Sequence, residues 1–269
     1  MAEFSTLNLI DTHCHLDLSI FDPDRDAVLQ RAVDNAVSEI IIPAISVDNW
    51  LKIKSLTAKH SNLYPAYGLH PMFMSQHKPQ DLYHLEQWLQ SENAIAVGEC
   101  GLDFFIFNQK TNVEQAKSAQ QYLFHGQLAL AQQYKLPVII HSRKSLDLVL
   151  KEIRQYSDLQ GVIHSFSGSE QQAYQLIDQG FYLGFGGPIT YTRAKKLRHL
   201  VATLPLNALL LETDAPDQPD ARHYRQRNEP AFLFGILEMI AKLRGISTQE
   251  VGNVTTANAK QLFKFSSFK

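Results

Sequence analysis

The sequence predicts an α/β protein, a single (β/α)8 TIM barrel, and three observations support this fold class. Eight apolar runs alternate with amphipathic stretches along the chain. Most of these runs are almost continuously apolar, as expected for parallel strands buried on both faces. The length of 269 residues suits one such domain, since these barrels have about 250 residues. An open, doubly wound sheet is the alternative that the same alternation allows.

The expected elements follow one another in regular order. The strand candidates are Leu7–His13, Glu39–Ala44, Leu63–His70, Ala94–Asp103, Pro137–Ser142, Gly161–Phe166, Tyr182–Gly187 and Ala208–Pro216. The helices expected between and after them include Asp24–Val37, Glu114–Tyr134, Ser145–Tyr156, Pro230–Arg244 and Thr248–Phe263. No linker or low-complexity tract interrupts this pattern, so we expect one domain over residues 1–269.

The composition argues against several classes of protein. A formal net charge of -2 argues against a broad basic face for duplex DNA, although it allows a local basic cluster. No apolar stretch is long enough to span a membrane, and the start MAEFSTLNLI lacks the pattern of a signal peptide. Two cysteines without a Cys-x-x-Cys motif fit a reducing compartment. We therefore expect a cytoplasmic protein without membrane association or an obligate protein partner.

A His-x-His motif at the end of the first apolar run is the starting point for function. His13 and His15 are separated by Cys14, and alternate residues of an extended chain face the same side. The two imidazoles can therefore act as a pair of metal ligands. By the same alternation Cys14 points away from them, and we interpret Cys14 and Cys100 as small packing residues.

Further ligand candidates end or follow other strands, where barrels of this class have their active sites. The six candidates for metal ligation are His13, His15, Glu99, His141, His164 and Asp214. Each has a simpler interpretation, since a single strand-end histidine is often structural, Glu99 can cap a loop and Asp214 can cap a helix. Their recurrence at matching positions favours a metal site.

Four imidazoles and two carboxylates are too many for one tetrahedral ion with an open position. They suit two divalent ions, one held by His13, His15 and Asp214, the other by His141 and His164, with Glu99 as a bridge. Such ions can activate water and stabilise attacking and leaving oxygens. Asp214 and Glu99 are thus candidate catalytic residues, with Asp214 as the general base. Mixed nitrogen and oxygen ligands admit Zn, Mn, Co, Ni or Fe, and Mg less readily.

Six motifs together resemble the TatD family of metal-dependent deoxyribonucleases over essentially the whole chain. They are Asp11-Thr12-His13-Cys14-His15-Leu16-Asp17, Gly68-Leu69-His70-Pro71, Val97-Gly98-Glu99-Cys100-Gly101-Leu102-Asp103, His141-Ser142-Arg143, Phe166-Ser167-Gly168 and Leu211-Glu212-Thr213-Asp214-Ala215-Pro216. The stretch Gly186–Tyr191 is most similar to the YjjV-like branch. The resemblance implies a TIM barrel of the amidohydrolase superfamily and the six ligands named above. Asp217-Gln218-Pro219 departs from the common family pattern, so the substrate loop is expected to differ.

The function expected from these features is a phosphodiesterase or deoxyribonuclease, resembling a 3'–5' exonuclease, that acts on DNA or oligonucleotide ends with a metal-activated water. Hydrolysis of a small substrate, such as a lactone, an amide or a small phosphoester, is the alternative. Arg143 lies two residues after His141, so we expect it to bind a substrate phosphate. His70 is the second expected substrate contact, with a structural role as its alternative.

Basic residues in the segments that follow three of the predicted strands support a phosphate-bearing substrate. These residues are Arg143, Lys144, Arg193, Lys195, Lys196, Arg222, Arg225 and Arg227. The simpler interpretation is that surface loops carry charge in any case. No clear interleaving of aromatic and basic residues is visible in the sequence, although Phe104, Phe105 and Phe107 could stack on bases.

Overall fold

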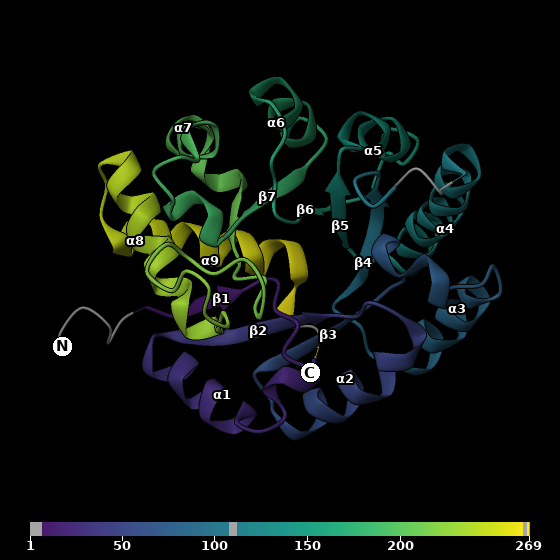
Figure 1. Cartoon of the computed structure of the whole chain (residues 1–269), viewed down its shortest axis with the longest axis horizontal. Helices are drawn as coiled ribbons and strands as arrows, with labels where there is room; N and C mark the ends of the chain where they lie inside the picture. The colour runs from purple at the N-terminus through teal and green to yellow at the C-terminus, as the bar shows by residue number, and fades with distance from the viewer. Residues whose placement is uncertain (1–6, 108–111, 266–267, 269) are drawn as a thin grey trace. The chain divides into compact units, whose positions relative to one another are not determined.

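The computed structural model describes residues 7–107, 112–265 and 268 (Figure 1). The first six residues of the N-terminal stretch that was expected not to be a signal peptide lie outside the described residues. Within these ranges, none of the helices combines the length and apolar character that crossing a membrane requires.

Eight parallel strands form one sheet in the sequential order β1 to β8. The strands are β1 Leu9–Asp11, β2 Val37–Pro43, β3 Leu63–Tyr67, β4 Ala96–Asp103, β5 Val138–Arg143, β6 Gly161–Ile163, β7 Phe181–Phe185 and β8 Leu209–Leu211. The last strand also returns to the first, because Thr12 donates its backbone N–H to the carbonyl of Leu211 at 3.1 Å. The predicted (β/α)8 barrel fold is therefore confirmed, and the open sheet is not the fold of this chain.

Helices separate most successive strands, as the alternation in the sequence predicts (Figure 1). They are α1 Arg25–Asp34, α2 Val47–Lys59, α3 Asp81–Ser91, α4 Val113–Tyr134, α5 Leu146–Ile153, α6 Glu170–Ile177, α7 Lys195–Thr203, α8 Leu233–Arg244 and α9 Thr248–Phe263. The described residues also form short 3-10 helices, which are η2 Ser19–Phe21, η3 Pro71–Gln76, η4 Gly187–Thr190, η5 Leu206–Ala208 and η6 Pro230–Phe232.

The chain divides into two compact units. Unit 1 comprises residues 1–42, 56–64 and 183–261, and unit 2 comprises residues 43–55, 65–182 and 262–269. In unit 1, β7 pairs with β8, β1 pairs with β2, and α7 packs against α8. In unit 2, β4 pairs with β5, β5 pairs with β6, and α4 packs against β4. The expectation of one domain over the whole chain stays a prediction.

Several strands end earlier than the sequence suggests. The sixth was expected to extend to Phe166, but it ends at Ile163, and a turn begins at His164. The eighth ends at Leu211, three residues before Asp214, whose φ of 58° lies in the left-handed region. A residue with that conformation cannot continue a strand, so these candidate ligands lie just beyond the strands rather than within them.

Candidate metal centre

In unit 1, the segments that follow β1 and β8 run side by side. His15 donates its backbone N–H to the carbonyl of Ala215 at 2.8 Å, and Asp214 donates its own to the carbonyl of His13, also at 2.8 Å. Cys14 and Ala215 form a parallel β-bridge between these two bonds. This local pairing brings two residues of the first strand's loop next to one from the last, although some 200 residues separate them in the sequence.

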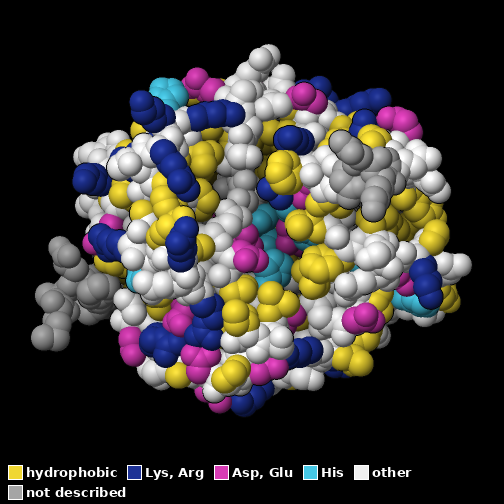
Figure 2. All heavy atoms as spheres, in the orientation of Figure 1, with side chains coloured by type: hydrophobic (Ala, Val, Ile, Leu, Met, Phe, Trp, Pro, Cys, Tyr) yellow, Lys and Arg dark blue, Asp and Glu magenta, His cyan; other side chains and the backbone are white. Residues whose placement is uncertain are grey.

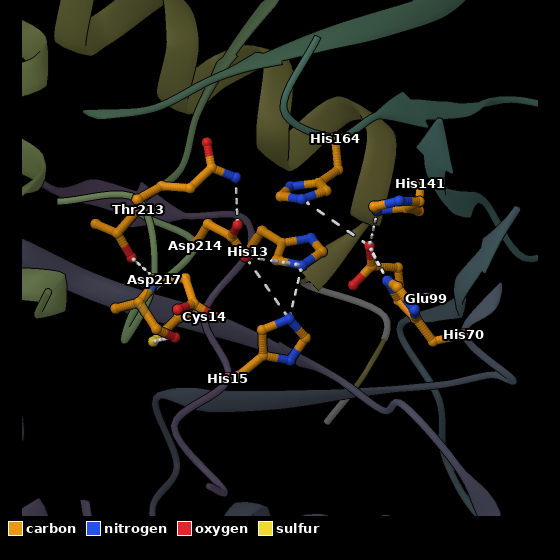
Figure 3. Close-up of polar contacts among 12 residues, drawn as sticks. His13, Cys14, His15, His70, Glu99, His141, His164, Thr213, Asp214 and Asp217 are labelled. Atoms are coloured by element: carbon orange, nitrogen blue, oxygen red, sulfur yellow. Dashed lines mark hydrogen bonds and ion pairs between the residues drawn. The ribbon is translucent and has the colours of Figure 1, made fainter. Parts of the chain in front are cut away.

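The side chains of His13, His15 and Asp214 form the first donor cluster, shown in Figure 3. The Nε2 atoms of the two histidines are 3.3 Å apart, and each lies 3.7 Å from Oδ1 of Asp214. Ligand atoms at about 2.1 Å from a tetrahedral ion are about 3.4 Å from one another. The spacing of these three atoms therefore fits ligands that share one divalent cation.

Hydrogen bonds of Asp11 and Gln218 hold the first cluster in place. Asp11 accepts hydrogen bonds from Thr213 N at 2.9 Å and Oγ1 at 2.5 Å, and from His13 N at 3.3 Å. Burial raises the pKa of Asp11 to about 7, although the bonds from Thr213 act in the opposite direction. The Nε2 of Gln218 donates to Oδ2 of Asp214. Asp214 therefore keeps Oδ1 directed toward the two histidines.

In unit 2, three histidines surround Glu99 and form the second donor cluster (Figure 3). Glu99 lies in β4, and its side chain is 1% exposed. Its Oε1 lies 3.0 Å from His70 Nε2, 3.2 Å from His141 Nδ1 and 3.9 Å from His164 Nε2. His141 lies in β5, whereas His70 and His164 follow β3 and β6. A buried carboxylate in this setting needs positive charge, from protons or from a metal ion.

The hydrogen bonds of the histidine rings distinguish His70 from His141. Nδ1 of His70 accepts the backbone N–H of Met72 at 3.0 Å, so a neutral His70 carries its proton on Nε2 and donates it to Glu99. His141 instead uses Nε2 to donate to Oδ2 of Asp103 at 2.9 Å. Its Nδ1 then offers a lone pair toward Glu99, as metal-ligating histidines do when a carboxylate holds the other nitrogen.

Two carboxylates act on the pKa of His141. Burial lowers its pKa, but the hydrogen bonds to Asp103 and Glu99 outweigh burial and raise the pKa above its usual value. The same contact has the reverse effect on Asp103, whose pKa is held below its usual value despite burial. When His141 is protonated, its Nδ1–H points toward Glu99. A bound divalent ion would take the place of this proton.

Asp103 is a residue whose role the sequence analysis missed. It lies four residues after Glu99 in the same strand, and this even spacing places both side chains on one face. The spacing was therefore an available clue. Only glycine fits at Gly101, between them, because a Cβ there would collide with the backbone carbonyl of His141.

Two buried glutamines of α4 also support the second cluster, and the sequence analysis missed both. Gln127 accepts the backbone N–H of Leu69 at 2.7 Å and donates to its carbonyl at 3.2 Å, which holds the residue before His70. Gln120 accepts the N–H of Asp103 at 2.9 Å and donates to its carbonyl at 3.0 Å. The two glutamines are seven residues apart, or about two helical turns. Polar residues in a helix usually face water, so no simple pattern pointed to them.

The basic residues expected near the substrate have different surroundings. Arg143 is exposed, and its Cζ lies 3.7 Å from the ring centroid of Phe105, with Lys144 Nζ at 4.8 Å from the same ring. Arg222 pairs with Glu238 at 3.0 Å. Arg227 pairs with two carboxylates and is engaged in structure rather than directed to a ligand.

Both cysteines have the packing role that the sequence predicts. Cys14 and Cys100 are free thiols, and both are buried. Burial raises the pKa of each thiol well above its usual value, so neither is a reactive thiolate at neutral pH.

Comparison with known proteins places this chain in a family. The family model described as TatD related DNase matches residues 10–264. The metal-dependent hydrolase YjjV of Escherichia coli K12 is 41% identical over 258 residues, which cover 94% of this chain and 97% of YjjV. YabD of Bacillus subtilis, also named a metal-dependent hydrolase, is 32% identical over 260 residues, 96% of this chain and all of YabD.

Solved structures agree with this assignment. The crystal structure of YjjV from Escherichia coli K12, a TatD homologue, superposes with a TM-score of 0.89 at 38% identity, and the match covers 96% of this chain and 98% of YjjV. A TatD-family hydrolase from Entamoeba histolytica shares the fold, with a TM-score of 0.80 at 24% identity over 96% of this chain and 98% of the other. With its two His-rich donor clusters and its (β/α)8 fold, the chain belongs to the TatD-related DNase family of metal-dependent hydrolases.

Proposed function

We propose that this hydrolase cleaves phosphodiester bonds as a deoxyribonuclease that acts at strand ends, resembling a 3'–5' exonuclease. Each donor cluster would hold one divalent ion, the first through His13, His15 and Asp214, the second through Glu99, His141 and His164. The expectation that Glu99 also bridges to the first ion stays a prediction. Bound ions would supply the Lewis acidity that activates water and stabilises negative charge on the reacting oxygens.

Asp214 is the proposed general base. Its carboxylate lies beside the two histidines of the first cluster, and its side chain is 14% exposed, so solvent reaches it. Gln218 holds Oδ2 by a hydrogen bond, which fixes the orientation in which the carboxylate takes a proton. Geometry of this kind is the first requirement for a general base, ahead of its pKa.

Arg143 carries the proposal of a phosphate substrate. It ends β5, two residues after the proposed ligand His141, and Cζ of its exposed guanidinium lies over the ring of Phe105, 3.7 Å from the centroid. Stacking on an aromatic face leaves the five N–H donors of the guanidinium plane available at its edge. A phosphate group is the ligand that such a fork binds best.

His70 was expected to contact substrate, and we propose that it does so as a hydrogen-bond donor. Its Nε2–H donates to Oε1 of Glu99 at 3.0 Å, and its Nδ1 is already engaged by the backbone of Met72. A substrate phosphate could accept the Nε2–H in place of Glu99 once an ion satisfies that carboxylate. His70 would then donate a hydrogen bond to the substrate without acting as a metal ligand.

The experiment that tests this function is an activity panel on the purified protein. End-labelled single-stranded DNA, aryl phosphodiesters and lactones are each assayed with Mg, Mn, Co, Ni and Zn. The proposal expects stepwise shortening of DNA from one end and hydrolysis of aryl phosphodiesters. Turnover of lactones or amides, with intact DNA in every metal, would instead establish the small-substrate alternative.

The proposed location is the cytoplasm. The two cysteines are free thiols in the structure, which agrees with a reducing compartment. DNA or oligonucleotide ends are the proposed partner, and we propose no obligate protein partner.

A further inference from the structure

Outside the two donor clusters, unit 1 carries a surface in which aromatic and basic side chains alternate. We call it the Tyr191–Tyr224 surface, and its contacting members are Tyr191, Arg193, Tyr224 and Arg225. The exposed Lys195 and Lys196 follow Arg193 in the sequence. This interleaving is not apparent in the sequence, because the two tyrosines come from segments more than 30 residues apart. In the structure their ring centroids are 6.2 Å apart, edge to face at 79°.

Each tyrosine of this surface has an arginine over its ring. Cζ of Arg193 lies 5.1 Å from the centroid of Tyr191, and Cζ of Arg225 lies 5.2 Å from that of Tyr224. Both arginines are exposed, and Tyr224 itself is 54% exposed. An exposed aromatic ring with a cation beside it is available to a ligand that has both flat rings and negative charge.

The segment that carries Tyr191 and Arg193 is basic, whereas the loop that carries Tyr224 also contains Asp217 and Asp220. The chain as a whole has 27 acidic and 25 basic residues, yet no Asp or Glu occurs between Asp178 and Glu212. That segment contains Arg193, Lys195, Lys196 and Arg198. Figure 2 shows Lys and Arg side chains gathered over α7 and α8, at the upper left of the view. The basic residues on the Tyr191 side of the surface are therefore a local cluster on a chain that is slightly acidic overall.

The same surface is joined to the loop that carries Asp214. Oη of Tyr191 donates to the carbonyls of Pro219 at 3.0 Å and Asp220 at 3.2 Å. Gln218, the residue before Pro219, donates to the carboxylate of Asp214. One loop thus carries Asp214 of the first cluster, the backbone that anchors Tyr191, and the exposed Tyr224.

We propose that the Tyr191–Tyr224 surface binds unpaired nucleotides of a nucleic-acid strand, at a distance from the bond that is cleaved. Tyr224 stacks on a base, and Arg193, Lys195 and Arg225 contact phosphates. The ligand is a single strand because stacked base pairs in a duplex do not offer their faces to a side chain. This inference rests on the proposed function, and it adds a second contact region that only substrates of several nucleotides can reach.

The test measures binding of labelled oligothymidylates with phosphorothioate linkages, which resist cleavage, by fluorescence anisotropy. Two lengths are compared, about 4 and about 16 nucleotides, which span the usual site sizes for single strands. The variants are Tyr224→Ala, Tyr224→Phe and the double variant Arg193→Gln with Arg225→Gln. The control is Tyr122→Ala with Arg154→Gln, because Tyr122 is 56% exposed on α4 and Arg154 is also exposed. Metal content and thermal midpoint are recorded for every variant.

Tyr224→Ala is expected to weaken binding of the longer strand about 5-fold or more, because stacking of one base contributes at least that much. Tyr224→Phe keeps the ring and should bind like the wild type. The arginine double variant should reduce the dependence of log Kd on log salt by about 0.7 for each lost phosphate contact. The control variant should bind both strands like the wild type.

Three outcomes would overturn the inference. One is unchanged binding of the longer strand by Tyr224→Ala. The second is that inorganic polyphosphate displaces the labelled strand as well as unlabelled oligothymidylate does, while only the arginine double variant binds the strand more weakly. That result would identify a general polyanion surface. The third is a wild type that binds and cleaves no nucleic acid, which would also refute the proposed function. DNA cleavage by the wild type with unchanged binding by Tyr224→Ala would refute the inference alone.

Discussion

The two donor clusters are supported in different ways. In the first, His13, His15 and Asp214 face one another across 3.3 to 3.7 Å, and the side chains of His15 and Asp214 are 11% and 14% exposed. In the second, Glu99 is 1% exposed and its Oε1 already has two histidine nitrogens within 3.2 Å. The two carboxylates thus differ in exposure, because solvent reaches Asp214 whereas Glu99 is enclosed. His141, beside Glu99, is 14% exposed.

This difference indicates a division of roles. An enclosed carboxylate with fixed histidines can hold an ion in place, since outer hydrogen bonds set the ring orientation and raise ligand basicity. A partly exposed carboxylate is better suited to exchange protons with solvent. We therefore expect the first cluster to perform the proton transfer and the second to retain its ion.

The largest effect is expected at Asp214. Asp214→Asn keeps the shape of the first cluster but removes the proton acceptor, so the hydrolytic rate should fall by at least ~100-fold, the usual scale of general-base effects. His60→Ala, a substitution beyond the end of α2, serves as the control and should retain wild-type rates. Near-normal turnover by Asp214→Asn with its metal content unchanged would mean that another group is the base.

The second prediction concerns how tightly the second cluster holds its ion. Asp103→Ala removes the acceptor of the His141 Nε2–H, and loss of such a contact typically weakens metal affinity by about 10–100-fold. Titration calorimetry on the metal-depleted protein should show one weakened site and one unchanged site. Asp103→Asn should recover part of the affinity, because the amide oxygen still accepts the hydrogen bond. Equal affinity in all three proteins would show that His141 does not need this contact.

The third prediction concerns substrate binding next to the second cluster. Arg143→Ala should raise KM for an aryl phosphodiester about 10-fold, the effect of losing a charged hydrogen bond, while the metal content stays the same. An uncharged lactone substrate should be affected far less. Lys144→Ala is the matched control, because Lys144 lies over the same ring of Phe105. Equal losses on phosphodiester and lactone would indicate a structural role for Arg143.

The smallest effect is expected in a charge network that supports unit 1. Arg227, at the end of the loop that carries Asp214, pairs with Asp24 and Glu229 at 2.7 and 2.8 Å. The hydrogen bond from Arg227 lowers the pKa of Asp24 from its ordinary 3.8 to about 2. A carboxylate with a lowered pKa stabilises the fold above the unfolded value, and this contribution is lost as the pH falls toward the folded value.

Asp24→Asn should therefore lower thermal stability slightly at pH 6, because solvent screens the partly exposed Asp24. The difference from the wild type should shrink as the pH falls from 4 toward 2. Thermal midpoints of both proteins over this range provide the measurement. A constant difference across the range would show that Asp24 does not contribute through its charge.

The order of elements was predictable because every strand is a distinct apolar run. Helix α9 occurs at its expected bounds, Thr248–Phe263. Strand ends were less predictable, as at β6, which ends at Ile163 although the apolar Phe166 lies three residues further on. Local apolar pattern determines where a strand lies, whereas its end depends on contacts with other segments.

The candidate site was predictable to the extent that its residues end apolar runs. His13, His15 and Asp214 lie together. Glu99 lies 3.2 Å from His141 and 3.9 Å from His164, but also 3.0 Å from His70, which was expected to contact substrate. Gln120 and Gln127 could not be found this way, because their partners are backbone groups of distant segments. The same reason explains why the pairing of Tyr191 with Tyr224 became visible only in the folded chain.

The most direct test of the two-cluster account is anomalous scattering from crystals grown with Mn or Zn. We expect two peaks, one for each bound ion, each at about 2.0–2.2 Å from its ligands. One peak should lie against His13, His15 and Asp214, and the other against Glu99, His141 and His164. A single fully occupied peak, with Glu99 outside ligand distance, would contradict the account.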